Sequence, residues 1–159
     1  MKKQLHLLPE CYADTLLVNR LIQSLSNHKR GISKVFTALK DTFRDRTAVG
    51  IIDDDKKKDK YFDEFKVVRD YEFFRYLSHP NGMHYIIAIR GGGIEKLIIK
   101  CAEEIGYTHP LIEDIELLKS KSKSITEDVE LRKIINTLIQ QESPTLLEMR
   151  RILLEHVTQ

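Results

Sequence analysis

Acidic residues follow two predicted strands of this chain. Glu10 comes directly after a short apolar run that ends at Pro9, and Asp53 and Asp55 come after a longer apolar run. The carboxyl ends of neighbouring parallel strands meet at one edge of a sheet, where ligands gather. Residues two apart in an extended segment point to the same side, so Asp53 and Asp55 should converge on Glu10. By the same rule, Asp54 should face away.

This group of carboxylates has two interpretations. Three hard oxygen ligands suit Mg²⁺ or Mn²⁺ far better than Zn²⁺, and a divalent ion removes the repulsion between the acids. The run Asp-Asp-Asp-Lys-Lys-Lys over residues 53–58 is also typical of a solvated surface loop, and acids after strands often cap helices or turns. The additional acid at the end of the first strand, Glu10, favours the metal site.

The elements that would position these acids alternate between strands and helices. At 159 residues and 42% hydrophobic content, the chain is predicted to form a single domain over residues 1–159. Alternating elements predict an α/β fold with a mainly parallel sheet over residues 1–108, followed by a helical C-terminal extension over 109–159. Strands are predicted at 4–8, 47–52, 71–77 and 83–89, and helices at 12–25, 33–45, 94–105, 111–118, 124–140 and 144–156.

The sequence also contains turn signals and one ambiguous segment. The last two strands should form an antiparallel hairpin, because Pro80, Asn81 and Gly82 supply turn chemistry between them. Residues 61–69 fit either a short helix or extended chain. The Gly91–Gly93 run before helix 94–105 is either a plain tight turn or a phosphate cradle, although it lacks the Lys-Ser/Thr of a P-loop.

Overall composition excludes some classes of function. The 26 Lys and Arg nearly cancel the 24 Asp and Glu, so any contact with nucleic acid depends on local charges. Two cysteines outside any CxxC pair argue against a zinc site and a disulfide framework, and they fit a reducing compartment. Neither a signal peptide nor an apolar stretch of about 18 residues is present, so we expect a cytoplasmic protein without membrane contact.

The acidic pattern resembles the TOPRIM domain of topoisomerases, bacterial primases and OLD-family (overcoming lysogenization defect) nucleases. Its elements are a strand ending in Glu10, an acid four residues later at Asp14, and a hydrophobic strand ending in Asp53-x-Asp55. The arrangement looks most like the OLD-type branch, where the acid at the Glu-plus-four position helps hold metal. Glu95 is similar to a further acidic position of that branch. The resemblance covers residues 4–108 and implies a TOPRIM/Rossmann-like sheet flanked by helices.

What the resemblance implies is a Mg²⁺- or Mn²⁺-dependent nuclease or phosphodiester-transfer protein that acts on DNA or RNA, with a role in bacterial defence. Its metal set would be Glu10, Asp14, Asp53, Asp55 and Glu95. Within that set Glu10, Asp53 and Asp55 would be catalytic, with Glu10 either a metal ligand or a general base. A separate ATPase partner is implied, because the OLD-type branch couples its TOPRIM module to an ATPase and this chain has no P-loop.

The lysines Lys56, Lys57 and Lys58 beside the acids, and His28 in a basic loop, are the candidate contacts to nucleic-acid phosphates. A solvated charged loop is the alternative for all four. For the whole chain, the alternative function is a non-catalytic regulatory or protein-interaction module that keeps the fold. A receiver-like or phosphatase-type site fits less well, because the acids lack an Asp-x-Asp-x-Thr motif.

Overall fold

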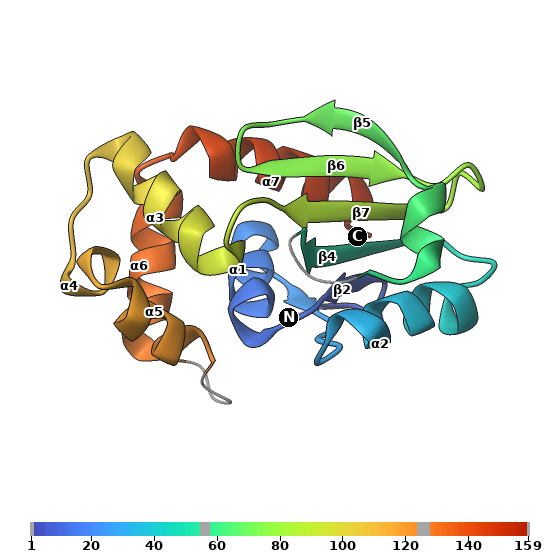
Figure 1. Ribbon diagram of the computed structural model, residues 1–159, viewed down its shortest axis with the longest axis horizontal. Helices are drawn as coiled ribbons and strands as arrows, with labels where there is room; N and C mark the ends of the chain where they lie inside the picture. The colour runs from blue at the N-terminus through green and yellow to red at the C-terminus, as the bar shows by residue number, and fades with distance from the viewer. Residues whose placement is uncertain (1, 55–57, 124–127, 159) are drawn as a thin grey trace.

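The computed structural model describes residues 2–54, 58–123 and 128–158. Its centre is a five-stranded sheet with the strand order β2-β4-β7-β6-β5, beside a small parallel sheet of β1 and β3 (Figure 1). Strands β2, β4 and β7 run parallel, whereas β6 is antiparallel to β7 and β5 is antiparallel to β6. The α/β class is therefore confirmed, and the sheet is mixed.

The elements follow one another in this order: β1 (Lys3–Gln4), β2 (Leu7–Pro9), α1 (Tyr12–Ile22), β3 (Leu25–Ser26), α2 (Ile32–Thr37), the π-helical turn η1 (Ala38–Thr42), β4 (Ala48–Asp53), the 3₁₀ helix η2 (Lys60–Glu64), β5 (Lys66–Asp70), β6 (Phe74–Ser78), β7 (His84–Ile89), α3 (Gly93–Ile105), α4 (Pro110–Glu113), α5 (Ile115–Ser122), α6 (Val129–Gln140) and α7 (Pro144–His156).

Helices cover both faces of the sheet. Along β4, Val49 and Ile51 pack with α1, α3, α6 and α7, whereas Ala48 and Ile52 pack with α2 and η1. Every residue of β4 is buried, which explains why this strand is an unbroken apolar run rather than an alternating one. The carboxyl ends of β4 and β7 point toward the side of the molecule where α3, α5 and α6 gather (Figure 1).

Helix α2 lies unusually close to the sheet at Gly50. A Cβ atom added there would lie 2.8 Å from Cγ1 of Val35, inside van der Waals contact. We therefore expect Gly50→Ala to lower the free energy of unfolding by about 1–3 kcal/mol through overpacking. Chemical denaturation would measure this loss. In a Val35→Ala background, where the clashing methyl group is gone, the same substitution should cost much less, and an equal cost would contradict this explanation.

The structure corrects the mainly parallel sheet that the sequence predicted. Residues 61–69, whose sequence fits either a short helix or extended chain, divide between η2 and β5. Strand β5 adds a second antiparallel pairing beside the predicted hairpin of β6 and β7. Its side chains are largely exposed, so β5 lacks the alternation of apolar and polar residues that marks a half-buried strand.

The N-terminal segments also differ from their predicted bounds. The predicted strand 4–8 divides into β1 and β2, and Pro9 forms the last pair of β2 instead of stopping the strand before it. Helix α1 ends at Ile22 rather than Leu25, because Gln23 adopts a left-handed conformation with φ of 53°. The chain then pairs with β1 as strand β3. The predicted helix 124–140 begins in residues outside those described, and α6 begins at Val129.

The C-terminal helices pack on the α/β core. Helix α7 buries Leu146, Met149, Ile152 and Leu153 in the same core as α1 and α3. At its end, Nε2 of His156 and the hydroxyl of Tyr76 on β6 are hydrogen-bonded at 2.6 Å. Within the described residues, no helix is both long and apolar enough to cross a membrane.

Candidate metal centre

Glu10 is held at the end of β2 by the neighbouring strand β4. The two strands pair in parallel with Pro9 opposite Ile51, so Glu10 reaches the carboxyl end of β4. The Glu10 backbone N–H donates to the carbonyl oxygen of Ile51 at 3.0 Å. In return, the backbone N–H of Asp53 donates to Oε2 of Glu10 at 3.0 Å. These two bonds fix the Glu10 carboxylate beside Asp53.

Asp53 and Asp14 complete a cluster with Glu10. Asp53 ends β4 and, two residues after Ile51, faces the same side of the sheet, toward α1. Asp14 lies in the first turn of α1, which begins after Cys11 as its N-cap. Oxygen atoms of the three carboxylates all lie within 4.8 Å of one another. The residues are buried, with exposed fractions of 2% for Glu10, 0% for Asp14 and 7% for Asp53.

This donor set fits a hard divalent cation. Mg²⁺ binds oxygen ligands at about 2.1 Å, so two oxygens of its shell lie roughly 3.0–4.2 Å apart, and small side-chain adjustments would bring the cluster to that spacing. Three buried carboxylates this close repel one another strongly, and a divalent ion offsets that repulsion. We call Glu10, Asp14 and Asp53 the acidic triad. The triad could hold a metal ion.

Gly93 at the start of α3 gives Asp53 the space that it occupies. A Cβ atom at Gly93 would lie 3.0 Å from Oδ2 of Asp53, and the backbone φ of 75° is one that side chains rarely adopt. We expect Gly93→Ala to displace the Asp53 carboxylate and to weaken divalent-cation binding at least tenfold, which is about 1.4 kcal/mol. Isothermal titration calorimetry with Mn²⁺ would measure the change.

Gly92→Ala is the matched control for this prediction. Gly92 also has positive φ, of 98°, but a Cβ atom there would meet the Lys96 side chain rather than Asp53. Both variants should therefore lose stability, whereas only Gly93→Ala should lose cation affinity. Equal cation affinities in the two variants would show that Gly93 does not shape the triad.

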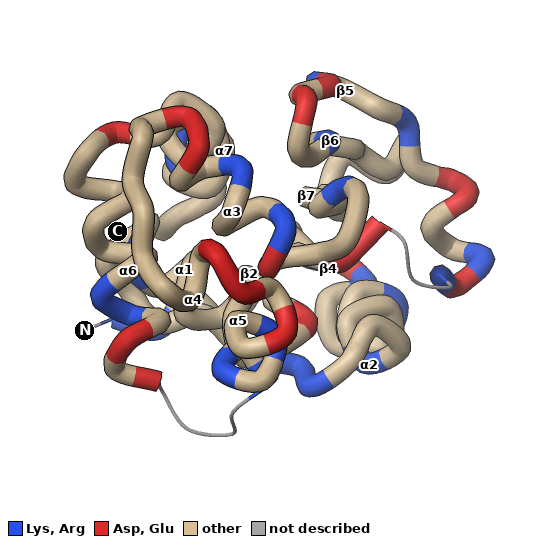
Figure 2. The backbone as a smooth tube through the Cα atoms, turned by 60° about the vertical axis from the view of Figure 1, so that its left-hand side comes forward, with Lys and Arg blue, Asp and Glu red and all other residues tan. Residues whose placement is uncertain are grey.

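A cleft of about 840 Å³ opens over the triad and includes Glu10 and Asp53 among its lining residues. Glu95 on α3 forms part of its wall and accepts a 2.6 Å hydrogen bond from Oγ of Ser122 on α5. This bond links α3 to α5, whose Lys119 and the following Lys123 also line the cleft. In Figure 2, blue segments lie around α5, and the end of β4 is red.

The opposite wall comes from the loop before α2. This loop runs along the outer edge of β2, because the N–H groups of Lys29 and Gly31 donate to the carbonyl oxygens of Pro9 and Glu10 at 3.0 and 2.9 Å. His28 and Arg30 of the loop consequently line the cleft. The His28 ring packs edge-on against Tyr12 at 4.9 Å. The cleft therefore has acids at its floor and basic residues on two sides.

The structure brings some of the predicted site residues together and places others apart. Glu10, Asp14 and Asp53 come together, and Glu95 lies in the cleft wall outside that cluster. Asp55, Lys56 and Lys57 lie outside the described residues. His28 lies in the cleft wall as described above.

Asp54 and Lys58 belong to a different contact. Asp54 faces away from the triad and accepts two hydrogen bonds from Arg75, at 3.0 and 2.9 Å. Burial raises the pKa of Asp54, but the bonds from Arg75 and Lys58 outweigh it and hold the pKa below its ordinary value. Lys58 also lies over the Phe62 ring at 5.0 Å and is not among the residues that line the cleft. Its role as a contact to nucleic-acid phosphates stays a prediction.

Sequence reasoning missed three basic residues of the cleft. Arg30 lies two residues from His28, in the basic loop that was already a candidate, so the run His-Lys-Arg contained its signal. Lys119 and Lys123 lie more than sixty residues beyond Asp53 in the chain. Only the packing of α5 against α3 brings them to the cleft, so no local pattern could have indicated them.

Burial changes the pKa values of two side chains beside the triad, Cys11 and His28. Burial, and then the charge of Asp14, raise the pKa of the Cys11 thiol far above its ordinary value, so the thiol stays protonated. Burial, and then Arg30, lower the pKa of His28, so its imidazole is mostly neutral at pH 7. Neither group therefore changes the negative charge at the floor of the cleft.

Comparisons of this chain with models of known protein families, with curated proteins and with solved structures find no match.

Proposed function

We propose that this protein is a Mg²⁺- or Mn²⁺-dependent, TOPRIM-like nuclease or phosphodiester-transfer protein that acts on nucleic acid. The observation that carries the proposal is the buried acidic triad at the carboxyl ends of β2 and β4. Acids that are buried together lower the stability of the fold, and a bound cation would offset that loss. The basic walls of the cleft support a polyanionic substrate above the triad.

The roles of the side chains follow from their positions. Asp14 and Asp53 would hold the cation, and Glu10 would either complete its coordination or accept a proton from the attacking water. A bound divalent ion would polarise the scissile phosphate and stabilise the leaving oxygen. Arg30, Lys119 and Lys123 would bind the flanking phosphates and fix the strand over the floor of the cleft. Glu95, tied to Ser122, holds the α5 wall in place.

Incubation with labelled single- and double-stranded DNA and RNA tests this proposal. We expect at least one substrate to be cut in Mg²⁺ or Mn²⁺ and none in EDTA. A separate ATPase is an expected partner, so the assay should be repeated with lysate of the source cells and ATP, where only cleavage above that of the same lysate with Asp53→Asn counts. The alternative, a non-catalytic module with the same fold, predicts cation binding without cleavage under either condition. Cleavage that persists in EDTA would overturn the metal-dependent mechanism.

A further inference from the structure

A second hollow adjoins the cleft over the triad. It has a volume of about 550 Å³ and lies between α1 and α6. Tyr12, the first residue of α1, and Ser122 on α5 line both spaces. The two spaces therefore share part of their walls, and a ligand at the triad that extended past Tyr12 would reach the second hollow.

The lining of this second hollow combines apolar surface with side-chain amides and with the charged residues Arg20, Lys121 and Asp128. Leu16 on α1 and Ile139 on α6 supply apolar contacts, and Asn136 and Gln140 are exposed amides on α6. Asp128 also lines the hollow, but its charge is countered by Lys121 at 3.5 Å and by the N–H of Leu131 at 2.9 Å. A flat aromatic ring with polar edges matches this lining, because apolar groups cover its faces while amides hydrogen-bond its edges.

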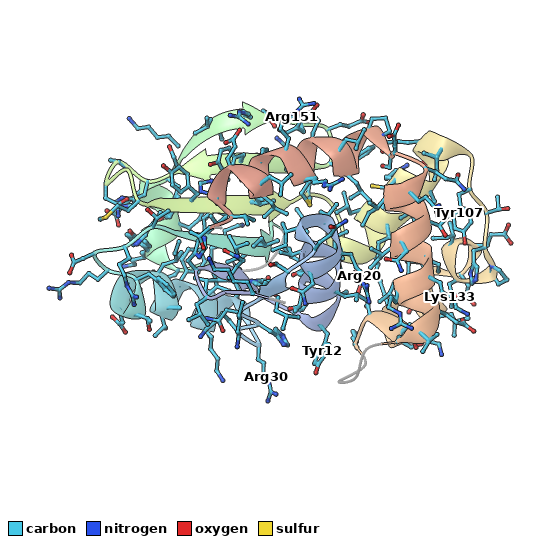
Figure 3. The ribbon with its side chains drawn as sticks, turned by 180° about the vertical axis from the view of Figure 1, so that it is seen from behind. Tyr12, Arg20, Arg30, Tyr107, Lys133 and Arg151 are labelled. Carbon is cyan, nitrogen blue, oxygen red and sulfur yellow. The ribbon has the colours of Figure 1, made fainter. Side chains whose placement is uncertain are left out.

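The charges of the adjoining cleft indicate what such a ring would be attached to. Arg30 lies on one wall and Lys119 and Lys123 on the other, above the acidic floor. Figure 3 shows Tyr12 and Arg30 extending to the same side of the molecule, one from the end of α1 and the other from the loop before α2. Cations for phosphates next to a hollow for a base match one strand of a nucleic acid.

The depth of the triad favours a single strand over a duplex. All three residues of the triad are at least nine-tenths buried, and the bases of an intact duplex are stacked inside the double helix. A duplex would have to unstack a nucleotide before any base could enter the hollow between α1 and α6. A single strand can splay its bases without that cost.

We propose that the hollow between α1 and α6 is a nucleobase subsite and that the protein selects single-stranded nucleic acid. The base next to the phosphate over the triad lies in this hollow, with Tyr12 at the entrance. This inference rests on the proposed function, because it takes the phosphate at the triad as its starting point.

Fluorescence anisotropy tests the subsite without cleavage. The probes are a labelled 12-nucleotide single strand, as DNA and as RNA, and a labelled hairpin duplex, in Ca²⁺ with their integrity checked on a gel. We expect the single strand to bind at least tenfold more tightly than the duplex. Tyr12→Leu and the double variant Asn136→Ala/Gln140→Ala should each weaken single-strand binding about tenfold, the size of one lost base contact.

Two controls make the outcome specific. Lys133→Ala removes a charge from an exposed position of α6 that lines neither the cleft nor the hollow. This substitution should change the single-strand affinity less than twofold. Stabilisation by Mg²⁺ should be unchanged in the Tyr12 and Asn136/Gln140 variants.

The possible results separate the subsite from the proposed function. Equal binding of duplex and single strand, or unchanged affinity in the subsite variants, overturns the subsite even when cleavage in Mg²⁺ is observed. Single-strand binding that the subsite variants lose, without cleavage in any metal either alone or with lysate and ATP, supports the subsite and contradicts the nuclease. Failure to bind any nucleic acid overturns both.

Discussion

Asp53→Asn should make the metal-free protein more stable and abolish its stabilisation by Mg²⁺. Without a cation, two carboxylate charges no more than 4.8 Å apart repel by at least roughly 3 kcal/mol at an effective dielectric constant of about 20. An amide of the same shape removes the charge of Asp53 from this cluster. We expect the free energy of unfolding in EDTA to rise by about 1–3 kcal/mol, the part of that repulsion left after local relaxation.

The order of stability should invert in Mg²⁺, where the wild type should be more stable than Asp53→Asn. A cation that binds only the folded wild type stabilises it by about 2.7 kcal/mol at a concentration one hundred times its dissociation constant. The variant lacks a ligand and should gain little. Urea denaturation of both proteins, in EDTA and in Mg²⁺, measures the four values.

Asp54→Asn is the matched control at the next position in the chain. Asp54 accepts two hydrogen bonds from Arg75 outside the triad. Loss of the Asp54 charge should therefore lower the free energy of unfolding by about 0.5–2 kcal/mol, equally in EDTA and in Mg²⁺. If Asp53→Asn instead destabilised the protein in EDTA and still responded fully to Mg²⁺, the triad would be an ordinary structural network.

Cleavage should decrease at least 100-fold in Glu10→Gln and in Asp53→Asn, under the metal conditions in which the wild type cuts. A factor of 100 to 1000 corresponds to about 2.7–4 kcal/mol of lost transition-state stabilisation, which is typical of removing a group that acts at the reacting phosphate. Asp54→Asn should stay within a few-fold of the wild type. Single-turnover rates across a Mg²⁺ titration provide the measurement.

The Mg²⁺ titration also assigns the role of Glu10. Glutamine keeps the oxygen that accepts the N–H of Asp53, so the local backbone should be preserved. If Glu10 is a ligand, Glu10→Gln shifts the half-saturating Mg²⁺ concentration upward. If it is the base, the half-saturating concentration stays near that of the wild type while the maximal rate decreases. Wild-type rates in both Glu10→Gln and Asp53→Asn would contradict a role of the acidic triad in cleavage.

The sequence predicted best those parts of the fold that a local pattern determines. The apolar run before Asp53 became the buried strand β4, and the turn residues Pro80–Gly82 lie between the antiparallel strands β6 and β7. Helix α3 begins within one residue of its predicted start. In each case, burial on both faces, turn chemistry or a 3.6-residue period leaves a mark within a few residues.

Tertiary contacts decided the elements that were predicted wrongly. Leu25 lies four residues after Leu21, which is helical spacing, so the sequence predicts a first helix that includes Leu25. The structure ends that helix at Ile22, and Asn19 accepts hydrogen bonds from both the N–H and the hydroxyl of Ser26 at 2.7 Å. Strand β3 then depends on β1, a partner more than twenty residues away, which local spacing does not record.

The candidate site shows the same division. The convergence of Glu10 with Asp53 follows from strand parity and from the parallel pairing of β2 with β4. The TOPRIM resemblance predicts Asp14 as part of the site. The position of Asp14 in the first turn of α1 places it against the ends of β2 and β4. The lysines of α5 reach the cleft only through the packing of the C-terminal helices, so residues after 108 contribute more to the site than the sequence indicated.

The most direct test of the acidic triad is anomalous diffraction from crystals of the protein grown with Mn²⁺. We predict an anomalous peak about 2.1–2.3 Å from carboxylate oxygens of Glu10, Asp14 and Asp53, at the carboxyl ends of β2 and β4. Crystals that contain millimolar Mn²⁺ and show no peak between these three side chains would contradict the metal centre.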